Sequence, residues 1–197
     1  MKLFNKIAIV GVGLIGGSIG LAVKKEKIAN RVIGIGHHQI SIKQALKVKA
    51  IDDGSLDINK VKEADLIILA APPQAIIDIF PKLSKLIGEK SIVIDVGSTK
   101  EKILEAASKT RLNFIGCHPL AGLEKKGPEN ASANMFAGSI CLLVPLKKTS
   151  PEAIKKIRIL WETLGSKTKV MSARKHDKIL SFVSHLPHVV AFSLMDC

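Results

Sequence analysis

Cysteine is scarce in this sequence, and the cysteines that are there form no recognisable framework. The three of them, Cys117, Cys141 and Cys197, show no CxxC spacing and leave no even number for pairing. This pattern excludes a disulfide scaffold, argues against structural zinc and is typical of the reducing cytoplasm. We therefore expect a cytoplasmic protein that binds no metal.

Long apolar runs are also missing. The longest of them, such as Ala64–Pro73, are well short of the ~20 residues that span a bilayer. The first run, Ile7–Val10, ends in glycines and has no signal-peptide cleavage pattern after it. The sequence thus predicts no transmembrane helix and no membrane partner.

Acidic residues are few compared with basic ones. There are 17 Asp and Glu against 30 Lys and Arg, which gives a net charge of +13. The lysines are scattered, and aromatic residues make up only 4% with no Tyr, so we expect no nucleic-acid partner. We interpret the charge as a lysine-rich solvated surface; attraction of anionic small substrates is the alternative.

The order of the apolar runs predicts an α/β protein. Short β-rich runs alternate with helix-like segments, a pattern typical of a mostly parallel sheet flanked by helices. Strands are expected at residues 7–10, 32–35, 66–70, 92–96, 114–115, 140–144 and 169–171. Helices are expected at residues 14–24, 41–48 with Ser41 as N-cap, 73–87, about 99–109 and 151–164.

The pattern changes near residue 172, which predicts a domain boundary there. Residues 1–172 contain all of the expected strands, whereas residues 173–197 show no strand pattern. This final segment is typical of one long helix that Pro187 bends or restarts. A chain of 197 residues has room for one large domain and the first helix of a second, all-helical one.

A glycine-rich loop follows the first expected strand and opens the first helix. Residues 11–16 read GVGLIG, which is GxGxxG in the context that dinucleotide binding requires. Gly11 permits the tight turn, Gly13 lets the backbone approach a pyrophosphate, and Gly16 lets helix and strand pack closely. With Leu14 and Ile15 these residues predict a NAD(P) site in a Rossmann-type, doubly wound sheet.

The second strand ends without the acidic residue that commonly binds the ribose of NAD. Counting about 20 residues from the glycine loop reaches Gly36, which is followed by His37 and His38. A carboxylate there would repel the 2′-phosphate of NADP, so its absence permits NADP as well as NAD. The two histidines either donate hydrogen bonds to that phosphate or are ordinary loop residues.

Small and polar residues follow two later strands, at the sheet edge where ligands of such folds bind. Ala71 and Pro72 would let the cofactor lie close, although proline is also an ordinary first residue of a helix. Ser98 would either bind near the nicotinamide or cap the next helix.

Histidines are the candidate acid–base residues. His118 ends a strand in a loop rich in glycine and proline, where an imidazole suits general-base work; a structural loop histidine is the alternative. Cys117 is expected to be a small buried residue. His185 and His188 lie three apart on one helix face, and no further metal ligands accompany them. We expect His176 at the surface or between the domains.

Four motifs in this order and spacing resemble the prephenate dehydrogenase family, which includes the arogenate dehydrogenases of tyrosine biosynthesis. They are GVGLIGGS, DVGSTK, GCHPLAG with the EKKG that follows, and VSHLPHVVAFSL, and the resemblance covers the whole chain. It implies oxidative decarboxylation of prephenate to 4-hydroxyphenylpyruvate, with hydride transfer to NAD(P)⁺. It also implies a homodimer built by a helical domain.

The resemblance implies a role for individual residues too. His118 would accept the proton of the substrate C4 hydroxyl, and Ser98 would hydrogen-bond near that hydroxyl. His188 and His185 would face the substrate from the helical domain, and Glu124 would lie at the mouth of the site. Two positions depart from the family pattern: Leu123 stands where a small hydroxyl residue is usual, and Lys126 where EKSG is usual.

Two other functions remain open at this point. A different Rossmann dehydrogenase, for example one acting on a 3-hydroxy acid, would share the glycine loop but would have no reason to carry HPLAG or SHLPH. A truncated, non-catalytic module that binds only NAD(P) is the second alternative, because the family continues into a helical domain and this chain stops at Cys197.

Overall fold

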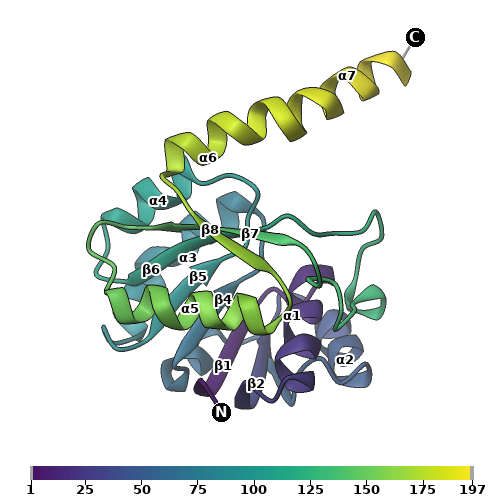
Figure 1. Cartoon of the computed structure of the whole chain (residues 1–197). Coiled ribbons are helices and arrows are strands. Elements are labelled where there is room, and N and C mark those ends of the chain that lie inside the picture. Colours follow the sequence, from purple (N-terminus) through teal and green to yellow (C-terminus); the bar gives the residue numbers. More distant parts are fainter. Residues whose placement is uncertain (1, 196–197) are drawn as a thin grey trace.

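The computed structural model describes residues 2–195, with the backbone alone for His185 and His188; Met1, Asp196 and Cys197 lie outside this part. Its centre is one eight-stranded sheet (Figure 1). The strands are β1 (Phe4–Val10), β2 (Ala29–Ile35), β3 (Asp53–Ser55), β4 (Leu66–Leu69), β5 (Ile92–Asp95), β6 (Asn113–Pro119), β7 (Ile140–Pro145) and β8 (Lys167–Val170).

The strand order is β3-β2-β1-β4-β5-β6-β7-β8. All neighbours pair in parallel except β6 and β7, which are antiparallel. The order reverses between β1 and β4, which creates the switch point beside which ligands bind in open α/β sheets. The predicted Rossmann-type, mostly parallel α/β fold is thereby confirmed.

Helices cover both faces of the sheet (Figure 1). Helices α1 (Leu14–Lys25), α2 (Gln39–Lys47) and α5 (Pro151–Thr163) pack on one face. Helices α3 (Pro73–Leu86) and α4 (Glu101–Ser108) pack on the other, with the 3₁₀ turn Ile58–Glu63. A second 3₁₀ turn spans Pro128–Asn130. Because the central strands are buried on both faces, they read as continuous apolar runs instead of alternating.

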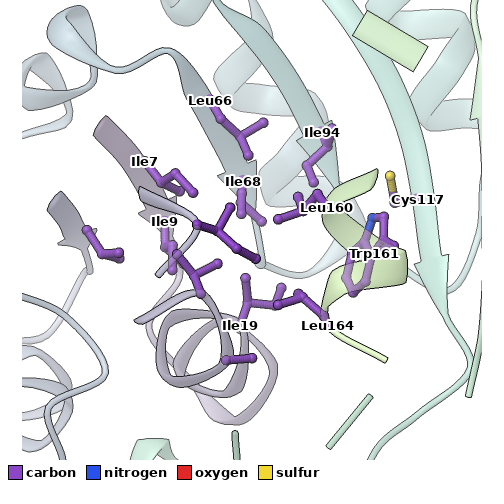
Figure 2. Packing of buried hydrophobic residues seen from close by; sticks show 14 of the residues in the cluster. Ile7, Ile9, Ile19, Leu66, Ile68, Ile94, Cys117, Leu160, Trp161 and Leu164 are labelled. Carbon is purple, nitrogen blue, oxygen red and sulfur yellow. The ribbon is translucent and has the colours of Figure 1, made fainter. Parts of the chain in front are cut away.

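The core on the α1 and α5 face is filled by side chains from strands that are distant in sequence. Figure 2 shows Ile9 and Ile68 on neighbouring strands pointing toward Ile19 of α1 and Leu160 of α5. Trp161 is fully buried in the same cluster, where its ring meets that of Phe136 edge to face at 5.3 Å. Edge-to-face packing of this kind adds about 0.5–1.5 kcal/mol to the effect of burial.

The structure corrects three local predictions. Helix α2 begins at Gln39 after His38, so Ser41 lies inside the helix and is not its N-cap. The strand expected at residues 114–115 runs from Asn113 to Pro119, because β7 pairs with it along its second half. The short edge strand β3, which has only three residues, was not predicted.

The chain ends in a helical segment that projects from the sheet (yellow in Figure 1). It consists of α6 (Ala173–Leu180), the π-helical turn Ser181–His185 and α7 (Leu186–Met195). Pro187 has no N–H for the usual helical bond, and the wider turn directly before it is a typical adjustment to such a defect.

The same segment carries large apolar side chains that the chain leaves exposed. They are Phe182, Val183, Leu186, Val189, Val190, Phe192, Leu194 and Met195. By length and composition Ala173–Met195 is able to cross a membrane, with a mean hydropathy of 1.3 in its most apolar part. This criterion uses length and composition alone, so the expectation that no helix crosses a membrane stays a prediction.

Candidate active site

The glycine loop lies at the switch point of the sheet. Gly11 has φ +98°, a conformation that favours glycine, and its N–H donates to the Ile35 carbonyl at 2.8 Å. A Cβ at this residue would lie 2.2 Å from the Ala70 carbonyl oxygen. The turn therefore holds the ends of β1, β2 and β4 in close contact.

The other two glycines of the loop differ in their surroundings. A Cβ on Gly16 would lie 2.0 Å from the Gly11 carbonyl oxygen, whereas a Cβ on Gly13 would meet nothing within 4 Å. Gly13 also precedes α1, whose N-terminus has no side-chain cap and no acidic residue in its first turn, which starts with Leu14 and Ile15. Such a helix end, with open space beside it, fits a pyrophosphate.

Gly36 follows β2 and is buried, and its N–H donates to the Ser55 carbonyl at 3.1 Å. His37 and His38 are exposed beside it, and His38 precedes α2 without capping it. The next carboxylate along the chain, Asp52, is engaged elsewhere. Its Oδ1 accepts a hydrogen bond from Lys24 at 2.5 Å.

The end of β4 has the small residues that the sequence predicted. Ala71 is half-buried and Pro72 is exposed. Pro72 also stands at the N-cap position of α3, and Pro73 is the first residue of that helix. These prolines therefore have their ordinary structural role at the start of a helix. Ala71 and Pro72 also place only small side chains at this end of β4.

Ser98 and His118 lie on one groove of about 910 Å³. One wall is formed by the sheet edge and the loop after β6, up to Gly122. The opposite wall is formed by the C-terminal segment, with Leu180, Val183, Ser184, Val189 and Phe192. Ser98 is exposed and does not cap α4, since Lys100 occupies the N-cap position. Of the two roles considered for Ser98, capping is excluded.

His118 is half-buried near the end of β6, where it pairs with Leu142 of β7. Its Nδ1 lies 2.9 Å from Nε2 of His176, in the first turns of α6. Nδ1 of His176 lies 2.7 Å from Oδ1 of Asp177. His176 is fully buried, so it lies between the sheet and the helical segment and not at the surface.

Asp177 caps a helix of the other part of the chain. Its two carboxylate oxygens accept hydrogen bonds from the backbone N–H groups of Lys100 and Glu101, each at 2.9 Å, at the start of α4. Partial burial by itself would raise the pKa of Asp177. The hydrogen bonds from Glu101, His176 and Lys100 outweigh burial and lower it.

A buried ion pair fixes the loop that carries Ser98. Nζ of Lys100 lies 2.5 Å from Oδ2 of Asp95, and both side chains are fully buried. The same ammonium donates to the carbonyls of Gly97 at 2.8 Å and Thr99 at 3.0 Å. Three acceptors around one buried cation make the pair specific in geometry, because a buried charge requires that its donors be satisfied.

Glu124 does not line the groove of His118. It is exposed and lines a neighbouring hollow with Gly122, Leu123 and Lys125, of which Gly122 also lines the groove. The side chains of His185 and His188 lie outside the described part of the structure. Cys117 is fully buried, as the sequence predicted. Among the side chains that the structure describes, no three His, Cys, Asp or Glu are placed to hold a metal ion.

Sequence reasoning gave no role in the site to His176, Asp177 or the pair of Asp95 with Lys100. His176 and His118 are 58 positions apart, and no spacing rule connects them. One available signal was Asp95, an aspartate in a buried strand that is followed five residues later by Lys100. A second signal was the adjacent pair His176 and Asp177 near the start of the final helix.

A mostly parallel sheet with a glycine loop at its switch point defines a dinucleotide-binding α/β domain. Comparison with known proteins identifies the family to which this domain belongs. The nucleotide-binding domain of prephenate dehydrogenase matches residues 19–170, and the dimerization domain of prephenate dehydrogenase matches residues 172–197. The chain belongs to the prephenate dehydrogenase family.

Individual relatives agree with this assignment. A prephenate dehydrogenase of Bacillus subtilis is 37% identical over 97% of this chain and 53% of its own length. The structure of A. aeolicus prephenate dehydrogenase with hydroxyphenyl propionate and NAD⁺ superposes with a TM-score of 0.93 at 35% identity, covering 98% of this chain and 68% of that one.

An arogenate dehydrogenase of Synechocystis superposes with a TM-score of 0.89 at 32% identity, covering 97% of this chain and 68% of that one. The chain spans about half the length of its B. subtilis relative.

Proposed function

We propose that the protein is a prephenate dehydrogenase that uses NAD or NADP and takes part in tyrosine biosynthesis. The observation that carries this proposal is the groove that holds both Ser98 and His118 at the carboxyl edge of the sheet. An acid–base residue and a hydroxyl beside a cofactor loop suit removal of a proton from a carbinol.

The cofactor would be held by the backbone of the glycine loop. Gly13 leaves open space, and α1 presents uncapped N–H groups to the pyrophosphate. When bound, the nicotinamide supplies the acceptor for the hydride from C4 of the substrate. The A. aeolicus relative was solved with NAD⁺, which supports the same cofactor here.

His118 would take the proton of the C4 hydroxyl while Ser98 orients that hydroxyl by a hydrogen bond. As C4 becomes a carbonyl carbon, the bond between C1 and its carboxylate breaks and CO₂ leaves. The electron pair of that bond enters the ring, which becomes aromatic, and the ring oxygen takes up a proton to give 4-hydroxyphenylpyruvate. Aromatisation drives the reaction, and general-base help contributes about 10²–10⁴ in rate.

Residues 173–197 would be the first helix of a helical domain that forms a homodimer, with the first domain ending at residue 172. The match of residues 172–197 to the dimerization domain supports this division. The exposed apolar side chains of this helix would then face protein and not lipid, in a cytoplasmic enzyme without nucleic-acid or membrane partners. Light scattering of the protein with its helical domain, with and without lipid vesicles, tests these expectations.

The experiment that tests the activity is formation of NAD(P)H at 340 nm with the protein that includes its helical domain. Prephenate and arogenate are supplied in parallel, because the Synechocystis neighbour acts on the latter class of substrate by its name. We expect turnover with prephenate. Turnover with arogenate alone would reassign the substrate, and turnover with neither would favour a module that only binds NAD(P).

A further inference from the structure

The hydrogen-bonded chain behind His118 determines where the protons of three side chains lie. It begins at Asp177, whose oxygens accept from two backbone N–H groups at the start of α4. A carboxylate held by two N–H donors at a helix N-terminus is stabilised in its ionised form. The lowered pKa of Asp177 agrees with that geometry.

An ionised carboxylate only accepts hydrogen bonds. Because Oδ1 of Asp177 lies 2.7 Å from Nδ1 of His176, that nitrogen must carry a proton. His176 is fully buried, and burial disfavours a second proton and a charged ring. The negative charge beside it is already shared by the two N–H donors of α4. A neutral His176 then has its lone pair on Nε2.

The same logic carries one ring further. Nε2 of His176 lies 2.9 Å from Nδ1 of His118, so the lone pair of His176 requires a proton on Nδ1 of His118. A neutral imidazole carries one proton, and Nε2 of His118 is then the basic nitrogen. His118 lines the groove with Ser98, where a substrate proton would be accepted.

We infer that His176 and Asp177 are positioning residues, which hold neutral His118 in its Nδ1–H form so that Nε2 is the proton acceptor. The inference rests on the proposed function only in naming the substrate proton. The chain of bonds has the arrangement of an acid, a histidine and a reacting group, with a second histidine in the place of the reacting group. This chain of hydrogen bonds also crosses from α6 to the sheet. Packing of the helical segment against the sheet therefore determines the tautomer of His118.

The direct test is the protonation state of the ring nitrogens, measured by long-range ¹H–¹⁵N NMR at about pH 8 on the ¹⁵N-histidine-labelled chain. The six histidines are assigned by single substitution. We expect a protonated Nδ1 and an unprotonated Nε2 on His118. Unconstrained histidine favours the opposite form, so the result discriminates. A proton on Nε2 of His118, or a doubly protonated His176, would overturn the inference.

Two substitutions of His176 separate positioning from packing. In His176→Gln the amide oxygen can accept from His118 and the amide N–H₂ can donate to Asp177, so the Nδ1–H form should persist. In His176→Leu a side chain of similar bulk offers no acceptor, and His118 should revert to the Nε2–H form. Lys175→Gln, on an exposed residue of the same helix, is the control. Identical tautomers in the Gln and Leu variants would contradict the inference.

Kinetics of the protein with its helical domain then link the tautomer to rate. His176→Leu should lower kcat by about 10²-fold or more with little change in KM, and His176→Gln should recover most of it. Turnover by a wild type whose His118 is in the Nε2–H form would refute the positioning role and keep the proposed function. The Nδ1–H form without turnover on either substrate would refute the function and keep the positioning role.

Discussion

The glycine loop and the groove of His118, both at the carboxyl edge of the sheet, are built by different means. At the glycine loop the backbone makes the site: six consecutive residues turn tightly and leave open space beside Gly13. At the groove, side chains make the site. His118 from β6 and His176 with Asp177 from α6 meet across 58 positions of sequence. The first end depends on the absence of side chains and the second on their exact hydrogen bonds.

This difference predicts that substitutions in the two regions cause different functional defects. A substitution in the glycine loop changes which volume is free, so it should affect cofactor affinity or folding. A substitution among the groove residues changes where protons lie, so it should affect rate. The comparison fails if a glycine-loop substitution lowers kcat with unchanged cofactor affinity and stability, or if a His118 substitution weakens cofactor binding with unchanged kcat.

The largest expected effect is that of His118→Asn. Asparagine keeps a polar side chain of similar reach but does not take the proton, so kcat should fall about 10²–10⁴-fold, or roughly 3–5 kcal/mol, with little change in KM. The wild-type rate should fall on the acidic side as the imidazole becomes protonated, and that limb should vanish in the variant. A near-normal kcat in steady-state assays would remove His118 as the base and leave His188 as the next candidate.

Gly13→Val and Gly16→Val form a matched pair in the same loop. Valine at residue 13 meets no protein atom through its Cβ, so the domain should fold while NAD(P) binds at least about tenfold more weakly, or ~1.4 kcal/mol. At residue 16 the Cβ would strike backbone, and stability should fall by about 1–3 kcal/mol or more. Calorimetric titration with NAD⁺ and NADP⁺ and circular dichroism in urea measure the two effects. Unchanged affinity in Gly13→Val would remove this loop from the cofactor site.

A smaller effect is expected at Gly36. Because no carboxylate stands there, NADP⁺ should be used at least as well as NAD⁺. Gly36→Asp should shift the ratio of kcat/KM toward NAD⁺ by roughly threefold to tenfold. Gly36→Asn is the control of equal size: it offers the ribose a hydrogen bond without repelling the 2′-phosphate. A wild type that strongly prefers NAD⁺ would show that another group binds the ribose.

The smallest effect concerns acid stability. The pKa of Asp177 is lower in the folded chain, so its stabilisation is present above the unfolded value of ~3.9 and is lost as the pH falls through the folded value. Urea unfolding of the wild type and Asp177→Asn should therefore differ most above about pH 4. The difference should shrink at lower pH. A gap that stays constant over this range would mean that the carboxylate contributes no such linkage.

Most of the fold could be predicted from the sequence because its signals are local. Buried parallel strands read as apolar runs, and glycines and prolines mark the ends of α3 and α5. The extension of β6 to Pro119 could not be predicted in this way, because it results from pairing with β7. The overall apolar character of the last helix was also not recognised, because His185 and Pro187 interrupt its apolar runs.

The candidate site divides along the same line. The tight turn at Gly11 and the close packing at Gly16 could be predicted from spacing alone, since each depends on immediate neighbours. His118 was predicted to be a base, but its partner was not predicted, because the contact with His176 exists only once α6 packs against the sheet. The roles assigned to Glu124, His185 and His188 stay predictions.

Trp161 gives the molecule a built-in optical reporter. It is the single tryptophan, there is no tyrosine, and it lies on α5, where it is buried against Phe136. Tryptophan fluorescence of this protein therefore comes only from the core between α5 and the sheet. A change in that emission reports unfolding of the nucleotide-binding domain. The projecting helix has no indole, so it can detach without changing the emission.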